Sequence, residues 1–369
     1  MRPLIPISAA LLLLSACTNL LDYRSGQAEE LIIMNAMLCT DETEHTVRLH
    51  RGLIDKVEPL DDARLDCYIN GSLAASAVRT DTHEGYDLSY STYSFVAAIR
   101  PGDEVRLEAT SGKLHASATV TAPLPATLVA VDTLTVTDSP YADVSTYSAA
   151  GVSNPDQVKG RALSCRLTLR DRPGETNWYR LRSTCEIEQK DHFPDHPGKD
   201  RTRQLRYDWY FGFDLDPILS DGYQSREENT DSILEPVYNY FCAFRDGRFS
   251  DGETPAEIHL SPVSTAKQPF YYPSEEGDDE NAVHTFHPRM ILRLLTLSAD
   301  EYNYLSALNR SLSRGFDWNF LTEPVPFPSN VEGGLGLVSV ASASDMVLDY
   351  PSYSIEGNLA PFMYYIEYY

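Results

Sequence analysis

The chain has 369 residues and a formal net charge of −24, because 54 Asp and Glu outnumber 30 Lys and Arg. Such an acidic surface repels the phosphates of DNA and RNA, which excludes a nucleic-acid-binding protein. The length is sufficient for two domains. A content of 42% hydrophobic and 11% aromatic residues is typical of a folded, strand-rich protein.

Residues 1–16 have the features of a secretory signal peptide. Arg2 is followed by an apolar run at residues 4–14, which is too short to span a bilayer, and small residues precede Cys17. A cysteine at this place resembles a lipobox, in which the acylated thiol becomes the first residue of the mature chain. The alternative is a plain signal peptide with a chance cysteine. We expect lipidation of Cys17, worth about 0.8 kcal/mol per buried CH₂, and a tether at residues 17–28.

Residues 29–122 are predicted to form a β-sandwich of immunoglobulin-like or transthyretin-like type. Short β-rich segments follow one another at regular spacing, and Asn-Gly, Pro-Gly and Ser-Gly pairs provide turns between them. These segments are 31–39, 45–52, 63–70, 72–78, 93–99, 103–110 and 113–121. Pro123 and Pro125 then interrupt the pattern, so residues 123–127 are predicted to be a stiff hinge.

Residues 128–369 are predicted to form a larger β-rich domain with long loops, so the fold class is all-β. Strands are expected at 128–137, 161–170, 177–189, 203–213, 237–245, 256–261, 286–297, 335–342 and 359–368. One amphipathic helix is expected at about residues 298–312. Ser298 and Glu301 form a capping box, and an apolar face follows from Tyr302 to Leu312.

The cysteines beyond Cys17 match no zinc-binding spacing. A Pro-Gly turn at residues 173–174 predicts a hairpin in which Cys165 and Cys185 lie opposite each other. In an exported chain this pair is a candidate disulfide. Cys39 and Cys67 lie in predicted strands, where buried free thiols are equally expected.

Four side chains of one polar loop are candidate metal ligands: Asp191, His192, Asp195 and His196. Imidazoles and carboxylates at this density can bind Zn²⁺ or another divalent ion. Two prolines give the loop a shape that need not bring the four groups together, so a solvated polar loop is the favoured interpretation. An acidic run at residues 275–281, followed by His284 and His287, lacks the ligand pattern of an EF-hand and is expected to be a disordered loop.

No catalytic motif is present, since GxSxG, HExxH, Walker and GxGxxG patterns are all missing. The stretch PSNVEGGLGLVS at residues 328–339 is too weak to change this conclusion. A phosphate loop needs a strand before its glycines and a helix after them, whereas prolines precede this stretch and β-formers follow it. The glycines therefore predict a turn or bulge with close backbone packing. The residues given this structural role are Ser329, Asn330, Gly333, Gly334 and Gly336.

Several segments in this order resemble one family. They are the lipobox, YSFVAAIRPGDEVRLEAT (93–110), FRDGRFSDGE (244–253), LSADEYNYLSAL (297–308) and EPVPFPSNVEGGLGLVSVAS (323–342). Together they resemble the Bacteroidota lipoproteins classed as domain-of-unknown-function family 4249. The resemblance implies an outer-membrane lipoprotein that accompanies a TonB-dependent transporter, and it supplies no catalytic residue. Val338-Ser339 departs from the family pattern, which has a large aromatic residue near this point.

The resulting prediction is a non-catalytic, lipid-anchored outer-membrane accessory protein that works with a TonB-dependent transporter in nutrient uptake, without a cofactor. It would face the cell surface or the periplasm, and its ligand would be a small molecule, glycan or peptide. One alternative is a surface adhesin or assembly subunit. Another is a metal-dependent hydrolase that uses His192 and His196.

Overall fold

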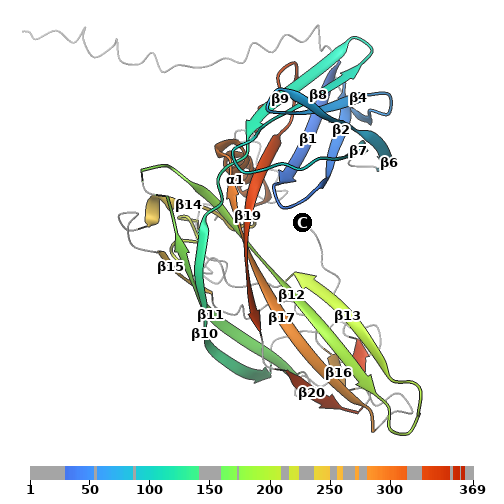
Figure 1. The fold of residues 1–369 in the computed structure, drawn as a ribbon, viewed down its shortest axis with the longest axis vertical. Coiled ribbons are helices and arrows are strands. Elements are labelled where there is room, and N and C mark those ends of the chain that lie inside the picture. The colour runs from blue at the N-terminus through green and yellow to red at the C-terminus, as the bar shows by residue number, and fades with distance from the viewer. Residues whose placement is uncertain are drawn as a thin grey trace, which may run out of the picture.

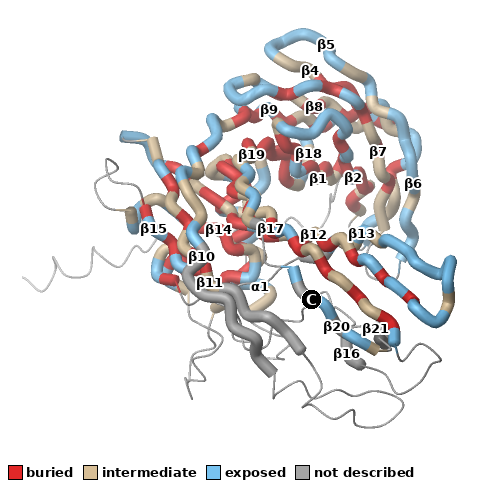
Figure 2. Tube along the Cα trace, turned by 60° about the horizontal axis from the view of Figure 1, so that its bottom comes forward, coloured by how far each residue is buried: buried red, intermediate tan, exposed pale blue. Residues whose placement is uncertain are grey.

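The computed structural model describes residues 30–53, 56–85, 89–140, 159–172, 174–208, 216–223, 237–249, 256–260, 271–273, 281–313, 326–349, 352–357 and 359–361. These residues form an all-β fold with one α-helix, α1 (Ala299–Ser313), which confirms the predicted fold class (Figure 1). Buried and exposed residues alternate along most strands, as expected where one face of a sheet is packed and the other is solvated. Figure 2 shows buried residues recurring at every second position along β12.

The N-terminal part is a sandwich of two sheets that share one core. The first sheet contains β1 (Leu31–Cys39), β2 (Glu44–Gly52), β3 (Val57–Pro59), β6 (Val78–Glu84) and β7 (Ser89–Val96). The second contains β4 (Arg64–Ile69), β5 (Ser72–Ser76), β8 (Glu104–Ser111) and β9 (Leu114–Thr121). Ile32 and Met34 from the first sheet pack with Leu65 and Leu107 from the second, and all four are at most 1% exposed.

The C-terminal part is built on a long sheet and a smaller sheet that covers one of its faces. The long sheet contains β12 (Trp178–His192), β13 (Arg201–Asp208), β14 (Ala243–Arg245), β17 (Val283–Leu297), β19 (Val338–Asp349) and β20 (Tyr353–Glu356). The covering sheet contains β10 (Thr127–Pro140), β11 (Lys159–Arg170) and β15 (Ala256–Leu260). A short pair is formed by β16 (Tyr271–Pro273) and β21 (Leu359–Pro361). Leu167 of β11 packs with Leu181 of β12 and Leu292 of β17 in the core between the two larger sheets.

Strand β19 belongs to both parts of the molecule. Its first residues, Val338 to Ala341, pair in parallel with Ala36 to Cys39 of β1. Its later residues, Ser342 to Asp349, pair antiparallel with β17. The main sheets of the two parts are therefore one continuous twelve-stranded sheet, and β19 runs from beside β1 to beside β17 (Figure 1).

The predicted hinge at residues 123–127 is fastened to this shared strand. Ser342 Oγ donates a hydrogen bond to the Pro123 carbonyl at 2.5 Å, and Ser344 Oγ donates one to the Ala126 carbonyl at 2.5 Å. The Ala126 N–H donates to Thr296 Oγ1 of β17 at 3.0 Å. Hydrogen bonds at both ends of the segment therefore hold the two parts in one orientation.

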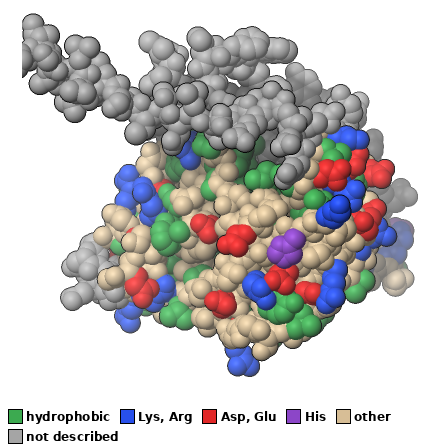
Figure 3. All heavy atoms as spheres, turned by 90° about the horizontal axis from the view of Figure 1, so that it is seen from above, with side chains coloured by type: hydrophobic (Ala, Val, Ile, Leu, Met, Phe, Trp, Pro, Cys, Tyr) green, Lys and Arg blue, Asp and Glu red, His purple; other side chains and the backbone are tan. Residues whose placement is uncertain are grey.

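Helix α1 packs over the place where β19 passes from β1 to β17. Tyr302 and Leu305 of the helix form a separate apolar cluster with Cys39 of β1, Leu297 of β17 and Ala341 of β19. At the end of the molecule that carries the N-terminal sandwich, acidic and basic side chains are interspersed on the surface (Figure 3). None of the helical segments within the described residues is long and apolar enough to cross a membrane.

Candidate functional site

The glycine motif lies between the two sheets of the N-terminal sandwich. Gly334 forms the short strand β18 (Gly334–Leu335) and pairs in parallel with Ile32 of β1. A Cβ atom on Gly333 would lie 2.6 Å from the His115 carbonyl oxygen of β9, and one on Gly334 would overlap the Ile32 carbonyl oxygen. Gly336 has φ +116°, and a Cβ there would lie 2.9 Å from the Met34 carbonyl carbon. Only residues without a side chain allow this backbone to pass so close to β1 and β9.

Two asparagine side chains fix the motif in this place. The Asn330 amide pairs with the backbone of Val338: its Oδ1 accepts from the N–H at 3.0 Å and its Nδ2 donates to the carbonyl at 2.7 Å. Asn35 Oδ1 of β1 accepts from the Leu337 N–H at 3.1 Å. In addition, Ser329 Oγ accepts from the Val331 N–H at 3.3 Å. The sequence pattern identified Ser329 and Asn330 but not Asn35, whose role depends on a partner about 300 residues away.

The motif also joins the second sheet of the sandwich. The backbone of Glu332 exchanges two hydrogen bonds with that of Ser117 in β9, at 2.7 and 3.0 Å. Val331 enters the core of the sandwich. The stretch therefore connects β1 to β9 and closes this edge of the sandwich, so its backbone groups are engaged with the protein.

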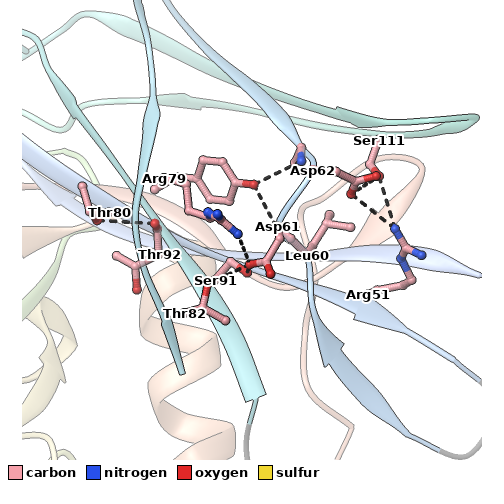
Figure 4. Close-up of polar contacts among 12 residues, drawn as sticks. Arg51, Leu60, Asp61, Asp62, Arg79, Thr80, Thr82, Ser91, Thr92 and Ser111 are labelled. Atoms are coloured by element: carbon pink, nitrogen blue, oxygen red, sulfur yellow. Dashed lines mark hydrogen bonds and ion pairs between the residues drawn. The ribbon is translucent and has the colours of Figure 1, made fainter. Parts of the chain in front are cut away.

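The crossover from β3 to β4 contains a cluster of polar contacts (Figure 4). Tyr93 Oη donates to the Leu60 carbonyl at 2.8 Å and accepts from the Ala63 N–H at 3.1 Å. These contacts hold both ends of the turn that carries Asp61 and Asp62. A buried tyrosine hydroxyl fastened to a crossing backbone is also a feature of immunoglobulin-like sandwiches.

Both carboxylates of this turn are occupied by neighbouring donors. Asp61 Oδ1 accepts from Ser91 and Thr82, each at 2.7 Å, and forms an ion pair with Arg79 at 2.7 Å. These three contacts lower the pKa of Asp61 to about 2. Asp62 accepts from Ser111 at 2.8 Å and from an arginine of β2 at 3.3 Å. These contacts fasten the crossover to strands of both sheets, so the cluster has a structural role.

The four candidate metal ligands are not brought together. Asp191 and His192 are neighbours in β12, so their side chains point to opposite faces of the sheet. His192 is exposed and contacts Asp200 at 2.9 Å, whereas Asp195 accepts from Asn281 at 2.7 Å. Across the part of the chain that the structure describes, no group of three or more His, Cys, Asp or Glu is placed to hold a metal ion.

Asp191 instead forms a buried polar cluster with residues distant in sequence. Its carboxylate accepts from His284 Nδ1 at 2.7 Å, from Gln189 Nε2 at 2.6 Å and from Arg201 Nε at 2.7 Å. His284 Nε2 also contacts the Gly357 carbonyl at 3.0 Å. Burial raises the pKa of Asp191, but the three donors outweigh this effect and leave the pKa below its ordinary value. The cluster ties β12 to β13, β17 and the segment after β20.

The predicted hairpin that would bring Cys165 and Cys185 together is wrong. Cys165 lies in β11, which pairs with β10 and β15, whereas Cys185 lies in β12, which pairs with β13, β14 and β17. The two cysteines therefore lie in different sheets. Both cysteines are buried free thiols, as are Cys39 and Cys67.

We expect Cys165 and Cys185 to resist alkylation in the folded protein, since burial raises the pKa of each thiol to about 12. Mass spectrometry after alkylation without a reductant should find both thiols unmodified before denaturation and modified after it. A peptide in which Cys165 is joined to Cys185 would contradict this expectation.

Residues 18–346 match the family described as "Domain of unknown function (DUF4249)". The match spans the N-terminal sandwich, α1, the glycine motif and most of β19. No curated protein matches the chain. Cys17 and the residues before it lie outside the part of the chain that the structure describes.

Proposed function

Because the chain belongs to this family of unknown function (DUF4249), we propose that it is a lipid-anchored outer-membrane protein of the Bacteroidota that assists a TonB-dependent transporter in nutrient uptake. The observation that carries the proposal is the position of the match, which begins at residue 18, directly after Cys17. A family match that begins at this point fits a chain whose first mature residue is an acylated cysteine.

The described polar clusters support a binding role, because their carboxylates are occupied by hydrogen bonds within the protein. The carboxylates of Asp61, Asp62 and Asp191 all accept hydrogen bonds from neighbouring side chains. A general base must be able to reach the proton of a substrate, and these groups are engaged with the protein itself. The shared strand β19 also fixes the two parts in one orientation. A surface that is already ordered binds a partner at a lower entropic cost.

The anchor is tested by replacing the thiol in the full-length chain. In the native host, Cys17→Ala should abolish labelling by a fatty-acid analogue and release the protein from the membrane fraction. Thr18→Ala is the matched control, because it changes the adjacent residue and keeps the thiol. Retention of the Cys17→Ala protein in the outer membrane would contradict the lipid anchor.

The partner is tested separately, by purifying the tagged protein from native membranes in mild detergent. A TonB-dependent transporter should co-purify, and it should be absent from a preparation made with an unrelated lipoprotein. Recovery of the protein alone would count against the transport role. A deletion strain that loses surface attachment but takes up nutrients normally would indicate the adhesin alternative.

A further inference from the structure

Glu301 lies on the face of α1 that packs against the sheet. Ser298 Oγ accepts the Glu301 N–H at 3.2 Å, so the first half of the predicted capping box is present. Glu301, Leu305 and Leu308 are spaced by four and three residues, which places their side chains on one face of the helix. The Glu301 side chain accordingly enters the packed interface, and the residue is only 2% exposed.

One oxygen of this buried carboxyl group has no hydrogen-bond partner in the part of the chain that the structure describes. Its Oε2 atom has no hydrogen-bond partner among the described residues, and the same is true of Ser339 Oγ on β19, which is fully buried. The apolar residues that line the same interface include Cys39, Leu297 and Ala341. Burial of an ionised carboxylate without hydrogen bonds costs several kcal/mol, so such a group tends to take up a proton instead.

The other charged groups at this junction have partners of their own. Arg180 of β12 is the charged residue that acts on Glu301, but its Nε donates to the Phe241 carbonyl at 3.1 Å.

On the helix, the exposed Asp300 accepts from Asn330 at 3.4 Å. The Tyr302 hydroxyl donates to Asp221, and Asp221 also accepts from Arg245. The Cys39 thiol of β1 is buried nearby, and burial raises its pKa to about 12. Among the described residues at the junction, Glu301 is thus a buried carboxyl group whose burial is only partly compensated.

We propose that the docking of α1 on the shared strand β19 is linked to a proton on Glu301. The neutral acid fits the apolar interface and can donate to the Ser339 hydroxyl, which satisfies both orphaned atoms. Ionisation leaves a buried negative charge and loosens the helix from the sheet. This proton-linked contact lies where the two parts of the molecule join, and it is independent of the transport role proposed above.

The direction of the pH effect follows from the burial. Burial raises the pKa of Glu301 above its ordinary value of 4.5, and the Ser339 hydroxyl and the Arg180 charge offset this only in part. In the unfolded chain Glu301 ionises near its ordinary pKa. Below this pH the group is protonated in both the folded and the unfolded state, so its raised pKa causes no loss of stability. The loss of stability then grows as the pH rises from the ordinary pKa toward the raised pKa of the folded state. The docked helix should therefore be less stable in alkaline than in acid solution.

The test follows hydrogen exchange of the α1 amides in the full-length chain from about pH 5 to about pH 9. After correction for the intrinsic rate, the exchange rate of the α1 amides should increase by about tenfold for each pH unit between the ordinary and the raised pKa of Glu301. Glu301→Gln should abolish this increase, because its amide cannot ionise. Asp300→Asn removes the same charge from the adjacent, exposed residue and should keep the increase. Identical pH profiles for Glu301→Gln and the unmodified protein would overturn the proposal.

A second measurement needs no variant and remains decisive if Glu301→Gln does not fold. Carboxyl-carbon NMR of selectively labelled glutamate should show one side chain in the unmodified protein that stays protonated well above the ordinary pKa of 4.5. Assignment to Glu301 can use the sequential amide of Tyr302. A Glu301 signal that titrates at or below this ordinary value would overturn the proposal.

Discussion

Alanine at position 336 should destabilise the protein by more than about 4 kcal/mol, or prevent folding. The added Cβ would lie 2.9 Å from the Met34 carbonyl carbon and 3.0 Å from Asn35 Oδ1, and still closer to the Met34 carbonyl oxygen. The residue also has φ +116°, which a side chain disfavours. To relieve the overlap, the backbone must move away from β1, which breaks the hydrogen bond from the Ala36 N–H to the Leu337 carbonyl at 2.8 Å.

Gly112→Ala is the matched control for Gly336→Ala. Gly112 has φ +58°, and no described atom lies within 4 Å of the position that a Cβ would take. Gly112→Ala should lower the free energy of unfolding by about 1–2 kcal/mol, which is the conformational cost of a left-handed residue. Urea denaturation followed by fluorescence measures both free energies of unfolding. Equal losses would show that the close approach to β1 contributes nothing.

Removal of the Asp191 carboxylate should cost about 2–5 kcal/mol, because each buried donor left without its acceptor costs about 1–3 kcal/mol. Asp191→Ala leaves the buried His284 Nδ1 and Gln189 Nε2 without their acceptor, and it also leaves Arg201 unpaired. Thermal unfolding should show the loss directly. Asp195→Ala, which removes an exposed carboxylate from the adjacent turn, should change the stability by less than about 0.5 kcal/mol.

The same carboxylate gives an acid-sensitive contribution to stability. The pKa of Asp191 in the folded state lies below its ordinary value of 3.8. Its contribution is therefore complete above pH 3.8 and is lost as the pH falls through the lowered pKa. Asp191→Asn should remove this part of the acid dependence while it retains much of the side-chain volume. If unfolding curves of Asp191→Asn and the unmodified protein fall in parallel below pH 3.8, the assignment is wrong.

The strand pattern of the N-terminal part was largely predictable, because most of its strands have one buried face. The alternation of apolar residues located β1, β8 and β9 within a residue or two. Strand β6 was missed, since VRTDTHE is exposed along almost its whole length and shows no apolar period. An edge strand of this kind is held by backbone pairing with β7, and composition alone does not record that pairing.

The polar clusters show why the rest was beyond prediction from local sequence. The strand period of β12 separates Asp191 from His192 and could have argued against a shared metal. The real partner of Asp191 is His284, which faces it because β12 and β17 pair in the register Asp191 to His284. That register depends on long-range packing. Glu301, by contrast, could have been noticed, since its spacing to Leu305 and Leu308 places it on the apolar face of the helix.

The pairing of β1 with β19 has a consequence for how the polypeptide matures. A nascent chain emerges with β1 first, and the edge of this strand stays bare until Gly334 to Ala341 have been made, more than 200 residues after the end of β9. The first sandwich therefore cannot be completed during synthesis by its own residues. This postpones closure of the sandwich until residues 334–341 have been made. It also means that chains terminated early would display an open strand edge, the kind of surface on which aggregates grow.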